Sequence, residues 1–327
     1  MNRDDRLSPE SQLKIDSIIK AQYSNIRGII VFQDGLNIHE KYYGRKSKED
    51  KFNVASVTKS VLSILIGIAV DKGYIKSINE KVMDFFPEYQ FTDSNRVRNQ
   101  VTIENLLTMT APFPFPNMKE PLGRMCRRKD WLEYALQILG TGGRIGTFKY
   151  STAGAHILSA ILTKSSKMSA REFANLFLFE PLGIKEIAFC PMQFDIDHIF
   201  GSKVQGWVSD PYGYSAGGWG LTLTLEEMAK IGQLYAQNGI WDGNQIVSKK
   251  WINSSTKENK NKYGYLWWLG DKENEYMAIG SGGNVIYINS RMNVVIAIAS
   301  TIVSRPRNRE YLINNILSML EDKSNQI

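Results

Sequence analysis

The sequence predicts an α/β protein of the α+β type, in which one antiparallel sheet is built from both ends of the chain and covered by helices. Three observations predict this fold. Strand-like apolar segments occur near the N-terminus and again between residues 263 and 300, whereas residues from about 75 to 200 are patterned as helix and loop. Residues 312–320 repeat apolar side chains at helical spacing. Such segments combine most economically as one antiparallel sheet that is covered by helices and carries a helical insertion.

Composition excludes several classes of protein. The chain has 327 residues, 43% hydrophobic and 22% charged, which excludes a disordered or fibrous chain and fits one large domain or two interlocked ones. The net charge of +7 arises from basic residues spread along the chain, whose densest groups, 45–48 and 124–129, are short. We interpret these groups as solvated loops and expect no nucleic-acid partner, with a basic nucleic-acid binder on another fold as the remote alternative.

The few cysteines and histidines and the charged N-terminus indicate which cofactors and which cellular location to expect. Two cysteines are too few for a disulfide framework or a cysteine-rich zinc site, and the histidines, His39, His156 and His198, are far apart in sequence. We therefore expect no metal or organic cofactor. The N-terminus is charged, without the apolar core of a signal peptide, and the longest apolar stretch is about half of a membrane span. We expect a cytoplasmic protein with no stable membrane insertion.

The first elements are marked by a cap and a turn. Ser8 and Pro9 place a capping hydroxyl before a proline at the first helical position, which predicts a helix to about residue 23. Asp34-Gly35 accepts the positive φ values of a tight turn, which predicts a hairpin of residues 29–32 and 36–42.

Two later helices have clear ends. Residues 57–70 are apolar almost all round, which is typical of a buried helix, and Gly73 suits its C-terminal stop. The hydroxyl and carboxylate of Thr224 and Glu227 form a capping box, which opens a helix that Gly239 can close.

The remaining elements follow from periodicity and from turn residues. Prolines at 112, 114, 116 and 121 predict a long irregular loop. The clearest helices are 102–109, 130–139, 153–166 and 170–179, and the C-terminal strands are 263–269, 276–279, 285–288 and 294–300. We expect a discontinuous sheet domain of residues 1–75 and 205–327, a mainly helical subdomain of 76–204, and an active site between them.

The first motif that carries chemistry is Ser56-x-x-Lys59. The chain contains four Ser-x-x-Lys sequences, but only this one lies where an extended segment meets a strongly apolar helix. Residues three apart share a helix face, burial disfavours a charged ammonium, and a helix N-terminus offers N–H groups to an oxyanion. These features predict a serine nucleophile with a lysine base. The alternative is that Ser56 only caps the helix and that Lys59 extends to solvent.

Two further motifs add to this prediction. Tyr150-Ser-Thr152 precedes an apolar helix, and its tyrosine can exchange a proton with the nucleophile and the leaving group. The glycine-rich segment 280–284 lies between two strands, where glycines allow close approach of a substrate, and the Asn284 N–H is a candidate oxyanion donor. The alternatives are a tyrosine that packs on a helix cap and an ordinary hairpin turn.

Together the three motifs resemble those of the serine β-lactamase-like and penicillin-binding-protein superfamily, and most of all its class C branch of esterases, D-aminopeptidases, D,D-carboxypeptidases and 6-aminohexanoate-dimer hydrolases. The resemblance extends in the same order over roughly residues 27–303. Its other landmarks are residues 34–35, 52–59, 101–108, 180–183, 214–218, 239–243 and 263–268. It implies a β-lactamase/transpeptidase-like fold without a cofactor.

The resemblance also implies roles for individual residues. Ser56 would be the nucleophile, Lys59 the group that activates it, and Tyr150 the catalytic tyrosine. The backbone N–H groups of Ser56 and of Asn284, or of a neighbour on that strand, would bind the oxyanion. The remaining expected binding residues are Thr152, Ser281, Gly282, Gly283 and Trp219, and Trp267 and Trp268 are either pocket or core residues, since alternation puts one on each face of a strand.

Three departures from the family pattern affect the expected substrate. Thr152 stands where the second motif usually has asparagine, and Ser281 where the third usually has lysine, histidine or another large residue. Met109-Thr-Ala-Pro112 replaces the frequent His-Thr-Ser-Gly. Without a cation for a substrate carboxylate, the first two departures favour an esterase or amidase that acts on a less charged acyl group.

We therefore predict a serine hydrolase that forms an acyl-enzyme on Ser56, with a small ester, amide or peptide-like substrate. One alternative is a β-lactamase or D,D-peptidase, which rests on the fold resemblance. Another is a non-catalytic ligand-binding protein, which Thr152 and Ser281 motivate. The acyl group, the leaving group and the oligomeric state are left open.

Overall fold

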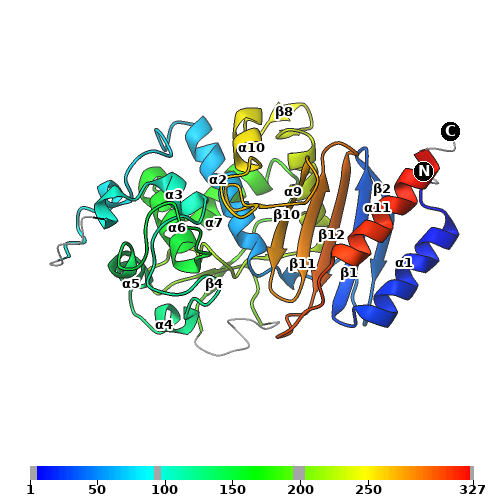
Figure 1. The fold of residues 1–327 in the computed structure, drawn as a ribbon, viewed down its shortest axis with the longest axis horizontal. Helices are drawn as coiled ribbons and strands as arrows, with labels where there is room; N and C mark the ends of the chain where they lie inside the picture. The colour runs from blue at the N-terminus through cyan, green and yellow to red at the C-terminus, as the bar shows by residue number, and fades with distance from the viewer. Residues whose placement is uncertain (1–5, 92–96, 194–202, 325–327) are drawn as a thin grey trace.

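A six-stranded antiparallel sheet forms the centre of the protein (Figure 1). The structure is a computed structural model of the chain, and it describes residues 6–91, 97–193 and 203–324. The first and last strands in sequence pair with each other inside this sheet, as the predicted fold requires. The strand order is β2 (Leu36–Tyr42), β1 (Ile26–Gln33), β12 (Val294–Ser300), β11 (Asn284–Asn289), β10 (Glu275–Gly280) and β9 (Trp268–Leu269).

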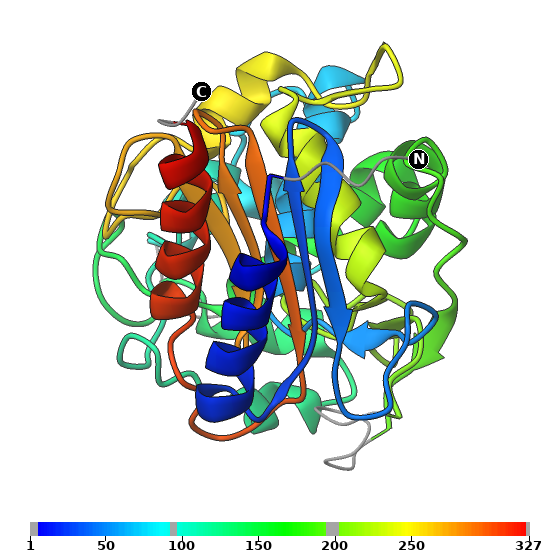
Figure 2. The ribbon, with the colours of Figure 1, turned by 90° about the vertical axis from the view of Figure 1, so that its right-hand side faces the viewer.

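Helices cover both faces of the sheet. On one face lie α1 (Pro9–Gln22) and α11 (Glu310–Ser324), side by side (Figure 2). Their apolar residues form a cluster with one face of the strands, including Ile29 and Ile296. On the opposite face, α9 (Leu225–Ala236) crosses β1, β11 and β12, and α2 (Val57–Asp71) packs beside β10. The alternation of side chains along each strand therefore produces two apolar layers.

The helix α2 is buried along nearly its whole length, as its apolar sequence predicts. All residues from Val57 to Ala69 are buried. At Gly67 a Cβ atom would lie 2.5 Å from the indole ring of Trp251, so only glycine lets the two elements approach this closely. The chain then leaves the helix through Gly73, whose φ of +76° is accessible to glycine at little cost.

The helical region contains the elements that the sequence predicts, with shorter bounds in two places. The predicted helix 102–109 is α3, of five residues, and the predicted helix 170–179 is α7 followed by a π-helical turn. These elements are α3 (Ile103–Leu107), α4 (Leu122–Cys126), α5 (Trp131–Ile138), α6 (Thr152–Ser166), α7 (Ala170–Ala174) and η3 (Asn175–Phe179), with the 3-10 turns η1 (Val82–Phe85) and η2 (Arg98–Gln100).

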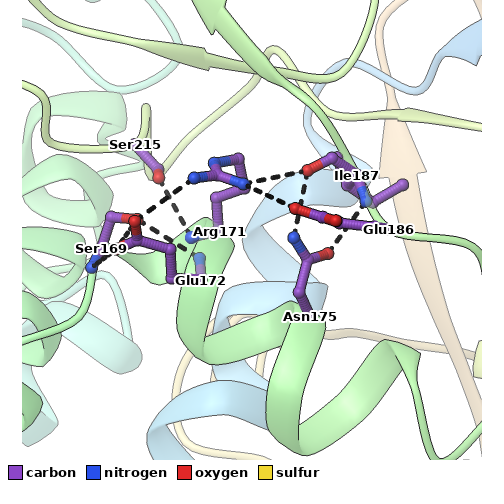
Figure 3. Close-up of polar contacts among 7 residues, drawn as sticks. All are labelled: Ser169, Arg171, Glu172, Asn175, Glu186, Ile187 and Ser215. Atoms are coloured by element: carbon purple, nitrogen blue, oxygen red, sulfur yellow. Dashed lines mark hydrogen bonds and ion pairs between the residues drawn. The ribbon is translucent and has the colours of Figure 1, made fainter.

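Polar contacts fasten α7 to two loops of this region (Figure 3). The Arg171 backbone N–H donates to Ser215 Oγ at 3.1 Å, and the Asn175 side chain both donates to and accepts from the backbone of Ile187, at 3.1 and 2.9 Å. Ser169 and Glu172 form a capping box at the start of α7. Because Ser215 begins the segment that leads to Gly218 and Trp219, these contacts help to place that segment.

Several short elements complete the fold. The predicted strand 263–269 is mostly wrong: only its last two residues belong to the sheet, because Leu266 adopts a φ of +60° and its N–H donates to Leu107 O. The helix α10 (Lys249–Ser255) precedes this segment. The other strands pair as β3 (Phe52–Asn53) with β6 (Thr222–Leu223), β4 (Phe189–Pro191) with β5 (Trp207–Ser209), and β7 (Ile240–Trp241) with β8 (Asn244–Gln245).

The local turn and cap predictions are confirmed. Asp34 and Gly35 have φ values of +50° and +77°, as a tight hairpin turn requires, and Thr224 and Glu227 form a capping box. No helix in the described part of the chain is long and apolar enough to cross a membrane. The division at residues 75 and 205 stays a prediction, since one apolar cluster runs without a break from the sheet into the helical region.

Candidate active site

Ser56 lies at the turn between β3 and α2, where it is the N-cap residue of the helix. The strand before it is held by pairing with β6 and by the Val54 N–H, which donates to Leu221 O at 3.0 Å. Ala55 adopts a φ of +49°, a left-handed conformation that is costly for a residue with a Cβ. The Ala55 N–H donates to Asn53 Oδ1 at 3.0 Å, which helps to hold this turn. The chain thus turns sharply to present the Ser56 hydroxyl.

Lys59 lies one turn further along α2, and only 1% of it is exposed. Its ammonium group donates to Ser56 Oγ at 3.1 Å, to Thr152 Oγ1 at 3.2 Å and to the Gly218 carbonyl at 2.8 Å. These acceptors use all three of its N–H groups. In the other three Ser-x-x-Lys sequences the lysine is exposed, so this is the one pair whose lysine is buried.

Tyr150 faces Lys59 from the start of α6. The Lys59 Nζ lies 4.8 Å from the centroid of the Tyr150 ring. The ring stacks on Trp268 at a centroid distance of 5.6 Å. The backbone N–H of Tyr150 donates to Asn117 Oδ1 at 2.9 Å. The structure therefore brings together Ser56, Lys59 and Tyr150, the three residues that sequence analysis selected.

Glu120 is a residue of this site that sequence analysis missed. Its two carboxylate oxygens accept hydrogen bonds from the Thr152 and Ala153 N–H groups, at the N-terminus of α6. Burial raises the pKa of Glu120, while these two N–H groups and the charge of Lys59 act in the opposite direction. Glu120 belongs to the irregular proline-rich loop, so neither periodicity nor a motif could have marked it.

The glycine-rich turn after β10 lies directly against the nucleophile segment. A Cβ at Gly280 would lie 2.2 Å from Val54 O and 3.2 Å from Ser56 N, so only glycine fits there. Ser281 follows and lines the same cavity as Ser56. Within the described residues, neither the Ser56 N–H nor the Ser281 N–H donates a hydrogen bond to the protein. Two unpaired backbone donors therefore belong to residues that line the cavity over Ser56.

Asn284, the other predicted oxyanion residue, does not line this cavity. It is fully buried at the start of β11, where its side chain donates to Ser281 O at 2.9 Å and accepts from the Ser300 N–H at 2.9 Å. Gly282 and Gly283 also lie away from the cavity, with φ values of +83° and +81°. These three residues shape the turn, and Ser281 is the one that faces the cavity.

The tryptophans divide between the site and the core. Trp219 lines the cavity and stacks on Trp131 with ring centroids 6.1 Å apart. Trp267 is buried, and its indole N–H donates to Tyr235 Oη at 3.0 Å. Trp268 lies beneath Tyr150. The expected alternation thus places Trp267 in the core and Trp268 next to the site.

The cavity over Ser56 has a volume of about 260 Å³. Glu120 is its only charged lining residue within the described part of the chain, so the wall offers a carboxylate and no lysine or arginine. The described residues contain no cluster of three or more His, Cys, Asp or Glu side chains that could hold a metal ion, and His198 lies outside them. The lining residues are Asn53, Ala55, Ser56, Met118, Glu120, Leu122, Tyr150, Thr152, Gly218, Trp219 and Ser281.

Comparison with known proteins places this chain in a family. The family model described as Beta-lactamase matches residues 16–320. The chain belongs to the beta-lactamase family. Ser56, Lys59, Tyr150 and the glycine-rich turn all lie within the matched residues.

Two further proteins are distant relatives of this chain. The 6-aminohexanoate-dimer hydrolase of Paenarthrobacter ureafaciens is 20% identical over 294 residues, which cover 82% of this chain and 70% of that protein. Beta-lactamase-like protein 2 of Dictyostelium discoideum is 21% identical, and the match covers 58% of this chain and 38% of that protein.

Solved structures confirm the β-lactamase/penicillin-binding-protein fold. The octameric penicillin-binding protein homologue from Pyrococcus abyssi superposes with a TM-score of 0.73 at 19% identity, over 94% of this chain and 77% of that one. EstCE1, a hydrolase with promiscuous acyltransferase activity, superposes with a TM-score of 0.72 at 14% identity, over 94% of this chain and 97% of that one.

Proposed function

We propose that this protein is a serine hydrolase that acts through an acyl-enzyme on Ser56, and that its substrates are esters or amides. The observation that carries the proposal is the hydrogen bond from the buried Lys59 ammonium to the Ser56 hydroxyl at 3.1 Å, inside a cavity. A serine hydroxyl is a weak nucleophile until an adjacent base accepts its proton. A buried lysine within hydrogen-bond distance is such a base once it has lost its own proton.

In the proposed acylation step, Ser56 Oγ attacks the carbonyl carbon of the substrate and its proton passes to neutral Lys59. The carbonyl π electrons move to the oxygen, which the Ser56 and Ser281 N–H groups stabilise. Both donors are unpaired within the described residues, which supports this role. Ser281 thus replaces Asn284 as the proposed source of the second donor.

Collapse of the tetrahedral intermediate expels an alcohol or an amine. The proton held by Lys59 reaches the leaving group through Tyr150, whose ring lies against the ammonium. In deacylation, water attacks the ester carbonyl, gives a proton to the same pair of residues, and releases the acid while Ser56 regains its hydrogen. Each proton removed in one half of the cycle is returned in the other, so no cofactor takes part.

The charges of the cavity support an acyl group without a carboxylate. No lysine or arginine lines the cavity within the described residues, so its wall offers no cationic side chain to a substrate carboxylate. A 6-aminohexanoate-dimer hydrolase is a distant relative of the chain, and a hydrolase with promiscuous acyltransferase activity shares its fold. These two proteins support ester and amide hydrolysis as the first candidate, and the penicillin-binding protein homologue of the same fold supports β-lactam or D,D-peptide turnover as the second.

The test is hydrolysis of p-nitrophenyl butyrate and of nitrocefin by the wild type, Ser56→Ala and Ser17→Ala. Ser17 belongs to another Ser-x-x-Lys sequence, whose lysine is exposed, and is the matched control. We expect ester turnover in the wild type and in Ser17→Ala, loss of at least about a thousandfold in Ser56→Ala, and no nitrocefin turnover. Equal ester turnover in Ser56→Ala would contradict the proposal. Nitrocefin turnover would instead favour a β-lactamase.

A further inference from the structure

Arg309 is a buried guanidinium with no carboxylate partner among the described residues. Only 3% of it is exposed, and it precedes α11, where its carbonyl accepts from the Ile313 N–H. The guanidinium lies 5.0 Å from the centroid of the Tyr23 ring. Its polar contacts are the carbonyls of Gly282, Gly283 and Arg307, at 3.0, 3.2 and 2.8 Å, with Asn25 Oδ1 at 3.0 Å and Ser300 Oγ at 3.1 Å.

Two of those acceptors belong to the glycine-rich turn that carries Ser281. Arg309 Nη2 donates to Gly282 O and Nε donates to Gly283 O. Asn25 Nδ2 also donates to Gly282 O, at 2.7 Å, and Ser300 Oγ donates to Gly283 O, at 3.2 Å. Arg309 contacts both of these helper side chains, so it is the centre of the network behind the turn.

The remaining carbonyls of the turn are fixed as well. Gly280 O accepts from the Gly283 N–H at 3.0 Å, and Ser281 O accepts from the Asn284 side chain at 2.9 Å. All four carbonyls from Gly280 to Gly283 are therefore bonded within the protein. In a trans peptide the N–H points opposite to the preceding carbonyl. Because Gly280 O is bonded inside the turn, the Ser281 N–H is directed out of it.

The packing around Arg309 is equally specific. A Cβ at Gly283 would lie 2.6 Å from Arg309 Nη2, so the guanidinium occupies the space that a side chain would need. Burial lowers the pKa of Arg309 to about 10, yet the group stays charged at neutral pH. An unpaired buried charge is expensive, and an apolar residue often fills such a place at lower cost. Unlike an apolar residue, Arg309 forms hydrogen bonds to the carbonyls of the turn.

We propose that Arg309 is a positioning residue, which holds the glycine-rich turn so that the Ser281 N–H points at the carbonyl oxygen of a substrate bound to Ser56. This inference rests on the proposed function. Arg309 acts through the turn and does not line the cavity over Ser56. Removing it leaves Gly282 O with the Asn25 donor and Gly283 O with the Ser300 donor alone, so the turn that orients the Ser281 peptide is held less firmly.

The position of Arg309 also makes chemical rescue feasible. It lines a separate groove of about 520 Å³, which shares no lining residue with the cavity over Ser56, together with Met277, Val285 and Arg307. A guanidinium ion in solution can reach a vacancy that opens into this groove. Arg307 lines the same groove but is exposed, which makes it a matched control.

The experiment measures p-nitrophenyl butyrate hydrolysis by the wild type, Arg309→Ala, Arg309→Lys and Arg307→Ala. Each protein is assayed without added salt and with about 5–20 mM guanidinium chloride or sodium chloride. We expect kcat to fall at least about tenfold in Arg309→Ala, toward the loss typical of an oxyanion donor, with KM within about threefold. Arg309→Lys should lose less than Arg309→Ala, and Arg307→Ala should match the wild type. Guanidinium, but not sodium, should restore part of kcat in Arg309→Ala only.

The outcomes separate this inference from the proposed function. Full kcat in a folded Arg309→Ala variant, or a loss that guanidinium does not reverse while Arg309→Lys is equally impaired, would overturn the positioning role. If Arg309→Ala does not fold, the same criterion applies to Arg309→Lys, whose kcat must fall while KM is kept. Wild-type turnover that does not depend on Ser56 would instead remove the proposed function, and the inference with it.

Discussion

Ala55 is the residue whose backbone sets the direction of the nucleophile. It is buried, and its φ of +49° forces the chain to turn between β3 and α2. A left-handed conformation costs a residue with a Cβ about 1–2 kcal/mol relative to glycine. The strained residue is the one that orients Ser56. This agrees with the general tendency of backbone strain to occur at functional sites.

Substitution of Ala55 should therefore separate strain from packing. Ala55→Gly relieves the strain but makes the unfolded chain more flexible, so its free energy of unfolding should stay within about 1 kcal/mol of the wild type, with activity kept. Ala55→Val adds β-branching at a positive φ and should destabilise by at least about 2 kcal/mol. Urea unfolding of both variants measures the difference. Equal stability of Ala55→Val and Ala55→Gly would argue against strain at this residue.

Glu120 gives the site a pH dependence of definite sign. Its pKa is raised in the folded protein, chiefly by burial, so the folded state binds its proton more tightly than the unfolded state does. Stability from this group is thus complete below the unfolded pKa and is lost as pH rises through the folded pKa. In the wild type, the free energy of unfolding should carry a negative contribution to its slope just above pH 4.5.

Glu120→Gln should remove this contribution. The amide offers one acceptor oxygen to the two N–H groups of α6, which should cost about 1 kcal/mol at every pH. Because it cannot ionise, the variant should gain stability relative to the wild type as pH rises. Urea unfolding at a series of pH values from 4 to 8, about one unit apart, compares the two slopes. Parallel stability profiles for the variant and the wild type would show that Glu120 does not titrate in this way.

Sequence patterns could predict some residues of the site because their signal is local. Ser56, Lys59 and Tyr150 stand at helix starts, next to capping or apolar sequences, and the structure brings them together, although their roles stay a prediction. Glu120 and Arg309 carry no such signal. Each acts on backbone groups far away in sequence, and only the folded path of a loop or of the last helix shows which ones.

At the scale of elements, the close contact between α2 and α10 can be tested at Gly67. A methyl group there would lie 2.5 Å from the Trp251 ring. This ring is rigid, so moving it aside costs free energy. Gly67→Ala should gain about 1 kcal/mol of helix propensity but lose more to overpacking, for a net loss of about 1–3 kcal/mol.

Gly123→Ala is the matched control for this prediction. Gly123 also lies in a helix, α4, but its Cβ would meet only the mobile end of the Arg127 side chain, at 3.2 Å. That variant should be neutral or stabilised by about 0.5–1 kcal/mol. Thermal unfolding of both variants distinguishes them, and stabilisation by Gly67→Ala would contradict the packing described here.

The elements that sequence patterns misplace are those whose ends are set by distant contacts. The apolar residues 263–269 have the composition of a strand, yet Leu266 binds α3 and turns the backbone out of the strand conformation. In contrast, β12 and α9 were predicted with nearly their observed bounds, because a turn or a capping box within the segment itself defines them. Turn and capping residues within a segment predict the bounds of an element well, whereas a contact with a distant segment can end the element early.

At the scale of the whole molecule, two apolar clusters share the central sheet. One joins α1 and α11 to one face, and the other runs from the opposite face through α2 into the helical region. Neither the sheet nor the helical region therefore buries its apolar surface alone. We expect a single cooperative unfolding transition rather than separate transitions for residues 76–204 and for the rest of the chain.

Two core substitutions test this cooperativity. Ile316, on α11, and Leu158, on α6, are fully buried in different clusters, and truncation of either to alanine should cost about 2–5 kcal/mol. In both variants the urea midpoints from far-ultraviolet circular dichroism and from tryptophan fluorescence should fall together. Splitting of the two probes in Leu158→Ala would show that the helical region unfolds by itself.

The pairing of β1 with β12 has a consequence for how the protein is made. A ribosome delivers the nucleophile helix early, but the turn that faces it, the strand that completes the sheet and the arginine behind that turn are all supplied by the last part of the chain. A nascent chain lacks these parts until Arg309 has been added, and domains fold as their segments emerge. Translation therefore completes the site only after the residues from the glycine-rich turn to Arg309 have left the ribosome.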